Sequence, residues 1–407
     1  MSKAKSSLEP SANMNCNSCG HELGEPFYRG CGNESITTMN TYINGGLRVF
    51  LCPACGHCQT LPLNDLKSYY ENDYEVGRQN EEDDQLYAMS EDGPIYRAQH
   101  QAAVLLRKVK IDSQTKVLDF GCGKSLTMRR VCGIINNFKP FVYDVTDKYL
   151  DLWLDITKKE YCAVNDVPES WDEEFDIVTS FYALEHIEDL YSICRKIRSL
   201  LRNSGYFYFI IPDMIANPAD FIVADHVNHF STSSLSALMM RTGFEVQEID
   251  HSSHYGAIIC LARKIDMPEE QLTQAIASTR IDEIEIDDQF TQKAYGLAEF
   301  WSSQNERLVK AISNLPKDRG IAIYGAGFYG TYLFGLAKRC GRNVECFIDS
   351  NPHMTGEKNN GIAIVAPSEV PSNVENILVG LNPSRAKTII GNTKDFANST
   401  YSFLYIE

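Results

Sequence analysis

Short apolar segments alternate with polar turns and helical stretches through the middle of the chain. The segments 117–120, 141–144 and 175–180 are rich in β-branched and aromatic residues, and each is followed by turn-forming or polar residues. Runs of this kind predict buried strands. A fourth run, 205–212, comes after a helical stretch. Strands that alternate with helices in this way predict an α/β domain with a mainly parallel sheet.

The alternation resumes near the C-terminus after a change of pattern. We expect 257–263 to be the last strand of the central domain, and the following segment, 269–288, is acidic and polar. Residues 290–315 have apolar positions at helical spacing and predict a helix that bridges two domains. Strands at 321–324 and 346–349 then predict a second α/β unit.

The first central strand ends in the pattern D-x-G-x-G, with Asp119, Gly121 and Gly123. Glycine lets the backbone turn tightly and approach a ligand, and the next helix offers unpaired N–H groups to it. The last glycine of the usual fingerprint is missing, and Ser125 stands in its place. The second strand ends in Asp144, about 20 residues further on, where a carboxylate normally holds the two hydroxyls of a ribose. The pattern therefore predicts a nucleoside-binding site.

Length and charge narrow the class of protein. A chain of 407 residues exceeds what one hydrophobic core usually serves, so we expect two or three domains. The formal net charge of −16 argues against a nucleic-acid or anionic membrane surface as partner, since phosphate binding needs a clustered basic face. The sequence has no membrane-spanning run, and residues 1–7 lack the apolar core of a signal peptide. An acidic cytoplasmic enzyme fits these features.

The cysteines cluster in a way that indicates a metal site. With 13 cysteines and no export signal, the chain is expected in a reducing compartment, with free thiols and a metal centre. Two C-x-x-C-G knuckles, Cys16 with Cys19 and Cys52 with Cys55, can each place two thiolates on one tetrahedral ion. We predict that these four residues bind a purely structural zinc ion.

The two knuckles are further apart than in compact zinc ribbons. We expect the insert between them to carry strands at 37–43 and 47–51. A redox dithiol would favour a single C-x-x-C beside a βαβ unit, and a nucleic-acid reader would need more Lys and Arg around the knuckles. The fourth ligand stays open to other candidates, which are Cys31, Cys58, His21 and His57.

The C-terminal unit opens with a complete G-x-G-x-x-G loop. It includes Gly325, Gly327 and Gly330, and the next strand ends at Asp349. Such a loop is compatible with a dinucleotide site or with a Rossmann-like half that takes another phosphorylated ligand. Because a cofactor site is already predicted upstream, we favour contact of Gly325 and Gly327 with a nucleotide-linked substrate.

The order of strands, loop and acid in the central domain resembles the class I S-adenosylmethionine-dependent methyltransferases. In that family the D-x-G-x-G loop, here Asp119, Gly121 and Gly123, meets the methionine end of the cofactor, and the second-strand acid, here Asp144, meets its ribose. The resemblance implies S-adenosylmethionine as cofactor, and we add Asp166 to the cofactor-binding set. A Rossmann-type unit for a dinucleotide is the alternative.

Across nearly its whole length, the chain resembles the nucleotide-sugar C-methyltransferases of deoxysugar biosynthesis. The fold class implied is α/β: a class I methyltransferase (Rossmann-like) middle domain, a small N-terminal zinc-binding domain and a C-terminal Rossmann-like domain. We place these parts at 1–80 (zinc-binding), 81–265 (methyltransferase), 266–315 (helical linker) and 316–407 (C-terminal domain). The resemblance implies that a sugar nucleotide lies beside the cofactor and is methylated at a carbon next to a ketone.

The family's active-site run, Tyr-x-Glu-His, aligns with the segment from Val223 to His226. His226 falls on the family's catalytic histidine, and Asp225 replaces its glutamate. Imidazole titrates in the range needed to remove a proton next to a carbonyl. Val223 replaces the family tyrosine, and His229 is a candidate to substitute for it. The two histidines lead into a helix predicted at 233–242, with Ser231 as its N-cap.

Other aromatic and ionisable residues complete the predicted site. The second aromatic position of the family fits Tyr87, with Tyr96 as a nearby alternative. His254 and Tyr255 lie where the family has a stretch that lines the substrate cleft, and we predict substrate contacts for both. The Leu-Glu-His run after the third strand contains Glu185 and His186, which we expect to be structural.

The sequence thus predicts transfer of a methyl group from S-adenosylmethionine to a nucleotide-linked ketosugar through an enolate, with His226 as base. Methylation of a sugar hydroxyl is the main alternative, since a histidine base would also serve that reaction and the missing tyrosine weakens the enolate argument. A third possibility is a binding module that senses S-adenosylmethionine without turnover. The oligomeric state is left open, and a monomer fits the sequence.

Overall fold

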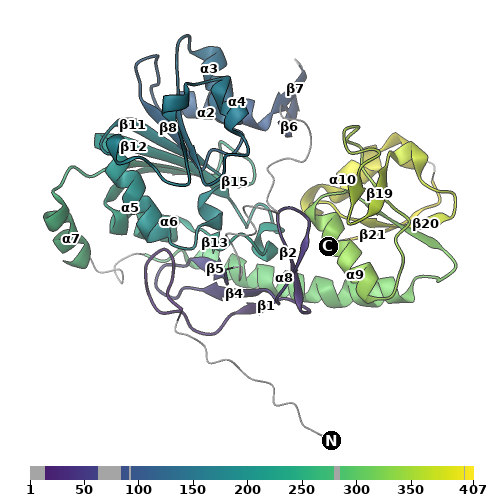
Figure 1. The fold of residues 1–407 in the computed structure, drawn as a ribbon. Coiled ribbons are helices and arrows are strands. Elements are labelled where there is room, and N and C mark those ends of the chain that lie inside the picture. Colours follow the sequence, from purple (N-terminus) through teal and green to yellow (C-terminus); the bar gives the residue numbers. More distant parts are fainter. Residues whose placement is uncertain (1–13, 63–83, 91–92, 279–284, 398) are drawn as a thin grey trace, which may run out of the picture.

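The computed structural model describes residues 14–62, 84–90, 93–278, 285–397 and 399–407. The three largest sheets organise these residues, and a long helix runs behind the N-terminal sheet and on to the C-terminal one (Figure 1). The domain limits expected from the sequence, at 80, 265 and 315, stay predictions. Within the described parts of the chain, no helix combines the length and the apolarity needed to cross a membrane.

The central sheet has seven strands in the order β10-β9-β8-β11-β12-β15-β14. The first five strands are parallel to one another, and β15 is antiparallel to both of its neighbours, β12 and β14. The predicted α/β fold with a class I, Rossmann-like centre is confirmed by this arrangement. The strands are β8 (Val117–Phe120), β9 (Phe141–Asp144), β10 (Cys162–Val164), β11 (Phe175–Phe181), β12 (Leu201–Pro212), β14 (Phe244–Asp250) and β15 (Ala257–Lys264).

Helices cover both faces of this sheet, because alternate residues of its strands are apolar on both sides. Leu118 and Phe207 pack on one face under helices α5 and α6, while Val117 and Tyr208 pack on the other under α2 and α3. Ser231 caps α6, as predicted, through its side chain and the N–H of Ser234. The helices are α2 (Arg97–Lys108), α3 (Leu126–Ile134), α4 (Leu150–Leu154), α5 (Leu190–Leu200) and α6 (Thr232–Thr242).

The N-terminal residues form a small antiparallel sheet of order β1-β4-β5-β13, whose last strand comes from the central part of the chain. A separate hairpin pairs β2 with β3. The strand predicted at 37–43 is wrong, since a turn closed by the N–H of Thr37 and the carbonyl of Thr41 separates these two strands. The strands are β1 (Tyr28–Arg29), β2 (Glu34–Ile36), β3 (Tyr42–Asn44), β4 (Arg48–Leu51), β5 (Cys58–Thr60) and β13 (Asn228–His229), and a further hairpin joins β6 (Leu86–Ser90) to β7 (Gly93–Tyr96).

Two helices follow the central sheet, α7 (Glu269–Ser278) and α8 (Asp288–Asn314). The first was not predicted, while the second matches the helix expected at 290–315. Helix α8 passes behind the N-terminal strands and reaches the C-terminal part of the chain (Figure 1). Its Trp301 belongs to one buried cluster with Tyr28 of the N-terminal sheet and Ile323 of the C-terminal one. The helix therefore ties the three parts of the chain into one core.

The C-terminal sheet has the order β18-β19-β17-β16-β20-β21, with all neighbours parallel except the β18–β19 pair. Helix α9 packs with α8 on one face, and α10 covers the other. This is the second Rossmann-like unit predicted from the sequence. Its elements are β16 (Gly320–Tyr324), α9 (Phe328–Arg339), β17 (Cys346–Ile348), β18 (Lys358–Asn359), β19 (Ile362–Val365), β20 (Val374–Val379), α10 (Pro383–Asn392) and β21 (Ser402–Tyr405).

Candidate active site and metal centre

The predicted cofactor loop lies at the point where the central sheet changes direction. Strands β8 and β11 are neighbours, but the chain leaves them toward opposite edges, and open α/β sheets bind their ligands at the carboxyl ends of such a pair. Gly121 has a φ of +69°, and a Cβ there would come within 2.9 Å of the Cβ of Ala183 in the loop after β11. The glycine is therefore required both for the turn and for the close approach of the two loops.

Asp119 fixes the loop from beneath. Its carboxylate accepts hydrogen bonds from the hydroxyls of Ser125 at 2.7 Å and Thr179 at 3.0 Å, and the side chain is buried. Burial raises the pKa of Asp119 to about 7, although the two hydroxyls act in the opposite direction. Ser125, which replaces the expected glycine, adopts the left-handed conformation with a φ of 50°. Ser125 therefore makes the turn that a glycine would make, and its hydroxyl also positions the carboxylate of Asp119.

Asp144 closes the loop from the neighbouring strand. It accepts hydrogen bonds from the N–H of Gly123 at 2.8 Å and of Thr146 at 3.2 Å. Asp166 is exposed in the turn after β10, next to Asn165, whose N–H donates to the carbonyl of Asp144. The five predicted cofactor residues are thus gathered at one edge of the sheet, and their contact with a cofactor stays a prediction.

A buried group of ionisable side chains lies where the N-terminal sheet meets the central one. His226 Nδ1 donates to one oxygen of Asp220 at 2.5 Å, and His229 Nδ1 donates to the other at 2.9 Å. All three residues are at most 8% exposed. One carboxylate therefore orients both histidines and leaves the Nε2 atom of each for another partner.

The charges of this group favour a protonated His226 in the free protein. Burial alone would lower its pKa, but the charge and hydrogen bond of Asp220, with smaller contributions from Glu185 and Asp225, raise it to about 9. The pKa of Asp220 is correspondingly held far below its usual range, because the two histidines outweigh the effect of burial. His226 and Asp220 therefore form an ion pair at neutral pH.

The carboxylate of Asp225, the acid next to His226 in the sequence, bonds to the N-terminal hairpin and not to His226. The Asp225 carboxylate accepts hydrogen bonds from the N–H of Thr38 at 2.7 Å and from its hydroxyl at 2.5 Å, and it lies 3.8 Å from Nδ1 of His186. Adjacent residues point in opposite directions here, so Asp225 faces the N-terminal hairpin while His226 faces Asp220. Asp225 thereby joins the segment that carries His226 to the turn between β2 and β3.

Sequence reasoning missed Asp220, which is the partner of both histidines. It lies in the short 3₁₀ helix η5 (Asp220–Ile222), and the chain must fold back to bring it to His226. The available signal was an isolated acid in an otherwise apolar stretch that ends in two histidines. Such an acid is buried at a cost unless it is paired.

Glu185 and His186 also belong to this group. They lie in η4 (Leu184–His186), shortly after β11. A carboxylate oxygen of Glu185, a ring nitrogen of His186 and a ring nitrogen of His226 all lie within 4.8 Å of one another. The rings of His186 and His226 meet edge to face at 4.7 Å. Glu185 is 1% exposed, and its Oε2 has no hydrogen-bond partner among the described residues. The structural role expected for Glu185 does not explain an oxygen left unpaired in this way.

The predicted aromatic positions lie close together, where β6 meets the turn before β15. The hydroxyl of Tyr87 accepts a hydrogen bond from the N–H of Tyr255 at 2.9 Å, and its ring lies 4.8 Å from that of His254. His100 stacks on the other side of Tyr87 at 4.1 Å. His254 is buried, and its Nε2 is unpaired among the described side chains. Tyr87 therefore fits the second aromatic position better than the exposed Tyr96 does.

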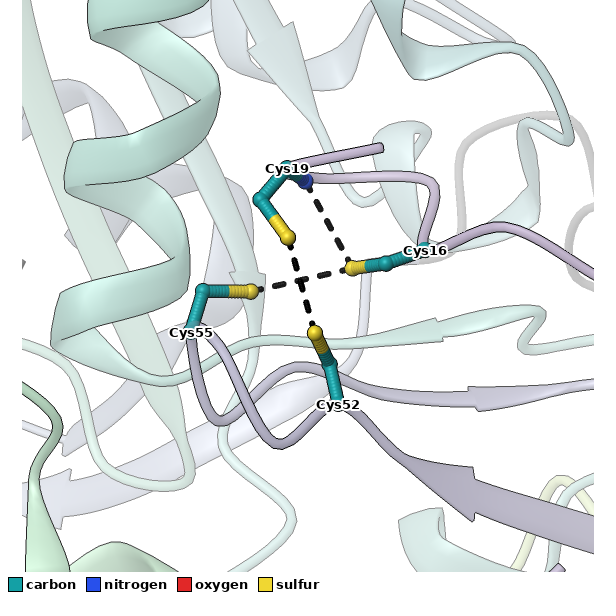
Figure 2. A group of neighbouring side chains, drawn as sticks. All are labelled: Cys16, Cys19, Cys52 and Cys55. Atoms are coloured by element: carbon teal, nitrogen blue, oxygen red, sulfur yellow. Dashed lines mark hydrogen bonds between the residues drawn. The ribbon is translucent and has the colours of Figure 1, made fainter. Parts of the chain in front are cut away.

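The two C-x-x-C knuckles converge as predicted. Their sulfur atoms point toward a common centre (Figure 2), with the Sγ atoms of Cys16 and Cys55 3.7 Å apart and those of Cys19 and Cys52 3.5 Å apart. All four residues are buried. Zn–S bonds of about 2.3 Å in a tetrahedron place sulfurs about 3.8 Å apart, so the group has the size needed for zinc.

The alternative ligands do not reach this centre. Cys31 and His21 are exposed, and Cys58 lies in β5. His57 Nε2 contacts the side-chain oxygen of Asn228 instead.

The cluster is also joined to the central domain, because the hydroxyls of Ser231 and Ser233 donate to the carbonyl of Cys55 at 3.2 and 2.8 Å.

The C-terminal loop is built around close backbone contacts. A Cβ on Gly325 would come within 2.4 Å of the carbonyl oxygen of Gly380, whereas nothing lies within 4 Å of a Cβ placed on Gly327. Asp349 accepts a hydrogen bond from the N–H of Ala326 at 3.0 Å. Packing thus accounts for Gly325 and leaves space above Gly327, where contact with the substrate stays a prediction.

Two residues outside the central domain hold the turn before Asp220. The hydroxyl of Tyr329, from α9, accepts from the N–H of Ala219 at 3.1 Å and lies 3.2 Å from the side-chain oxygen of Asn217. The indole of Trp301, from α8, donates to the carbonyl of Pro218 at 2.9 Å. The position of the Asp220 carboxylate therefore depends on the C-terminal part of the chain.

We expect a Tyr329→Phe variant to lose about tenfold in turnover, because it leaves the buried N–H of Ala219 without a partner and loosens Asp220. Steady-state kinetics check this. Tyr332→Phe is the matched control, since it removes from the same helix a buried hydroxyl that has no partner within the described structure. Equal rates for the two variants would contradict the role given to Tyr329.

Comparison with known proteins agrees with this geometry. Residues 95–249 match the model of the methyltransferase domain family. The chain carries a methyltransferase domain. A curated relative, the C-methyltransferase NovU of Streptomyces niveus, is 23% identical over 229 residues, which cover 54% of this chain and 54% of the relative. The chain thus spans about half the length of this curated relative.

Two solved structures that resemble this chain each match less than half of it. A Haloferax volcanii methyltransferase in complex with the Trm112 activator is 15% identical with a TM-score of 0.37, and the match covers 42% of this chain and 92% of that one. An S-adenosylmethionine-dependent methyltransferase from Mesorhizobium loti is 16% identical with a TM-score of 0.33, over 40% of this chain and 98% of that one.

Proposed function

We propose that this protein transfers the methyl group of S-adenosylmethionine to a carbon next to the ketone of a nucleotide-linked sugar, with His226 as general base. The observation that carries the proposal is the Asp220–His226 pair, buried at the edge of the sheet where the methyltransferase domain places its cofactor loop. The name of the curated relative, a C-methyltransferase, supports transfer to carbon.

The chemistry of this proposal needs a base and a site that excludes water. His226 Nε2 removes the proton next to the ketone, and Asp220 stabilises the imidazolium that forms, as a buried carboxylate does for a catalytic histidine. S-adenosylmethionine supplies the electrophilic methyl group. In this proposal Asp119 and Asp144 shape the loop that holds it, and His254 contacts the sugar through its Nε2, which is unpaired among the described residues.

Methylation at oxygen is the second candidate, and one observation favours it. The family tyrosine is replaced by Val223, so the hydroxyl that would contact the sugar or stabilise an enolate is absent at that position. His226 would then remove a proton from a sugar hydroxyl. A structural zinc ion at the cysteine cluster belongs to both proposals, because its four sulfurs are buried and none of the four cysteines is a predicted catalytic residue.

Turnover against a panel of nucleotide-linked 4-ketosugars and hydroxyl sugars tests the proposal. S-adenosylhomocysteine reports the rate, NMR locates the new methyl group, and deuterium uptake next to the ketone reports proton removal. A methyl group on carbon, with exchange that depends on His226, is the expected result. A methyl group on oxygen without exchange would replace the proposal by the second candidate, and no product on any sugar would overturn both.

We expect the pH–rate profile of turnover to have an ascending limb on the alkaline side of neutral pH. His226 acts as a base only when unprotonated, and its pKa of about 9 means that this form grows as pH increases through 8 and 9. An Asp220→Asn variant removes the charge that raises this pKa, so its ascending limb shifts to lower pH while its maximal rate falls about tenfold or more. Rate profiles over pH check both effects.

Asp225→Asn is the matched control for this shift, since Asp225 is also a buried acid near His226 but bonds to Thr38. Its contribution to the pKa of His226 is smaller than that of Asp220. A larger shift in Asp225→Asn than in Asp220→Asn would show that the wrong acid has been assigned to His226.

A further inference from the structure

We propose that Glu185 is a second catalytic residue, a carboxylic acid that donates a hydrogen bond to the carbonyl oxygen of the substrate and stabilises the enolate oxygen formed there. This inference rests on the proposed methylation at carbon. It concerns the group that the missing tyrosine leaves unassigned, and it gives a catalytic role to a residue for which the sequence predicted only a structural one.

The position of Glu185 brings it to the reacting atoms. It follows β11 within the loop that begins at Ala183, and Ala183 touches the cofactor loop at Gly121. Glu185 also approaches His226, since a carboxylate oxygen of the first lies within 4.8 Å of a ring nitrogen of the second. An acceptor that lies between the cofactor loop and the base therefore also lies beside Glu185.

The hydrogen bonding of Glu185 is incomplete. Its side chain is 1% exposed, and its Oε2 has no partner among the described residues. A buried oxygen of this kind destabilises the fold when it is unpaired, and more so when it is charged. This destabilisation disappears if the oxygen carries a proton that a substrate carbonyl accepts, so the missing partner fits a ligand.

The groups that face Glu185 keep it neutral. Asp220 and Asp225 are acids on its side of the cluster, and His226 is the nearby cation, while His186 adjoins it in the same turn. Burial raises the pKa of Glu185 to about 8, and His226 only partly opposes this effect. At neutral pH Glu185 is therefore largely protonated and can act as a donor, as buried acids do in other enolate-forming sites.

The proposed step balances as follows. His226 takes the proton next to the ketone, and the electrons of that C–H bond form a C=C bond while the carbonyl electrons move to oxygen. The O–H of Glu185 stabilises that oxygen. The enolate carbon then attacks the methyl group of S-adenosylmethionine, the S–CH₃ bond breaks toward sulfur, the ketone is restored, and S-adenosylhomocysteine leaves. No further reactant is needed.

The step requires Glu185 protonated and His226 unprotonated, although their pKa values are about 8 and 9. The required combination is a minor form that is most populated between these two values, so the rate is bell-shaped in pH. The descending limb belongs to Glu185. It reports loss of the donor proton.

Two substitutions of Glu185 separate donation from charge. Glu185→Gln keeps a neutral N–H donor at every pH, so we expect turnover within about tenfold of wild type and no descending limb. Glu185→Leu removes the donor, and we expect turnover to fall about 100-fold to 1000-fold, as when an oxyanion donor is deleted. Glu188→Gln, an exposed acid in the same segment, is the matched control and should keep the wild-type profile.

Infrared spectroscopy of the free protein tests the protonation state without turnover. The difference spectrum of wild type minus Glu185→Gln should contain the C=O band of a protonated carboxylic acid at pH 7, and the band should vanish by about pH 10. Far-UV circular dichroism and S-adenosylmethionine affinity confirm that each variant is folded.

The outcomes are distinguishable. A Glu185→Gln variant as inactive as Glu185→Leu would show that the charge is needed, as for a base or a bound cation, and would overturn the inference. An unchanged descending limb in Glu185→Gln, or no acid band, would overturn it too. If the wild-type protein makes no carbon-methylated product on any ketosugar, the proposed function itself fails, whatever the variants show.

Discussion

A His226→Ala variant is expected to lose at least about 100-fold in turnover while it binds S-adenosylmethionine as the wild type does. General-base catalysis typically contributes factors of 10² to 10⁴, and Asp220 orients His226 for this role. His229 shares that carboxylate, but its Nδ1 bonds to the opposite oxygen. S-adenosylhomocysteine formation and calorimetric cofactor binding measure the two quantities.

Removing a buried cation leaves Asp220 with one partner instead of two, which can destabilise the fold. His226→Gln addresses this, since its amide can still donate to Asp220 but cannot act as a base. His251→Gln is the surface control, because His251 is 46% exposed and lies outside the cluster. Full activity in His226→Gln would remove His226 from the mechanism, and loss of cofactor binding would point to a defect of folding instead.

The elements of the fold were predictable where local sequence decides them. Strands such as β9 (Phe141–Asp144) are apolar runs that end in an acid or a glycine. The spacing of the two C-x-x-C knuckles likewise predicts four sulfurs around one metal ion. The N-cap Ser231 was found for the same reason, since capping depends on neighbouring residues. These features need no knowledge of distant parts of the chain.

The geometry of the site depends on contacts that no local pattern encodes. His226 bonds to Asp220 only because the chain reverses between them, and that turn is held from α8 and α9 by Trp301 and Tyr329. The unpaired oxygen of Glu185 is equally a property of the packed structure. Sequence reasoning therefore found the histidine but not Asp220, the acid that orients it.

The second large effect is expected from the cysteine cluster. A Cys52→Ser variant should lose zinc and at least about 100-fold in turnover, although the cluster contains no predicted catalytic group. The strand after the second knuckle, β5, pairs with β13, so that Cys58 lies opposite His229. The hydroxyl of Thr60 also donates to the carbonyl of His226 at 3.0 Å. The N-terminal sheet thus forms one wall of the segment from His226 to His229, the histidine loop.

Loss of the metal should unfold this wall, because in small zinc modules the binding energy of the ion is largely folding energy. With β5 displaced, the loop that carries His226 loses its backbone partners, while the cofactor loop at Asp119 and Asp144 has none in the N-terminal sheet. Catalysis should therefore fall with cofactor affinity nearly unchanged. Metal analysis, S-adenosylmethionine binding and turnover, each measured before and after chelation, separate these effects.

Cys31→Ser is the matched control, since it removes an exposed thiol of the same module that lies outside the cluster. It should keep zinc and full activity. Chelated protein with normal turnover would show that the histidine loop does not need the wall. Chelation that abolished turnover while hydrogen exchange of β4 and β5 stayed slow would give the ion a role beyond folding, because the wall would then be intact without it.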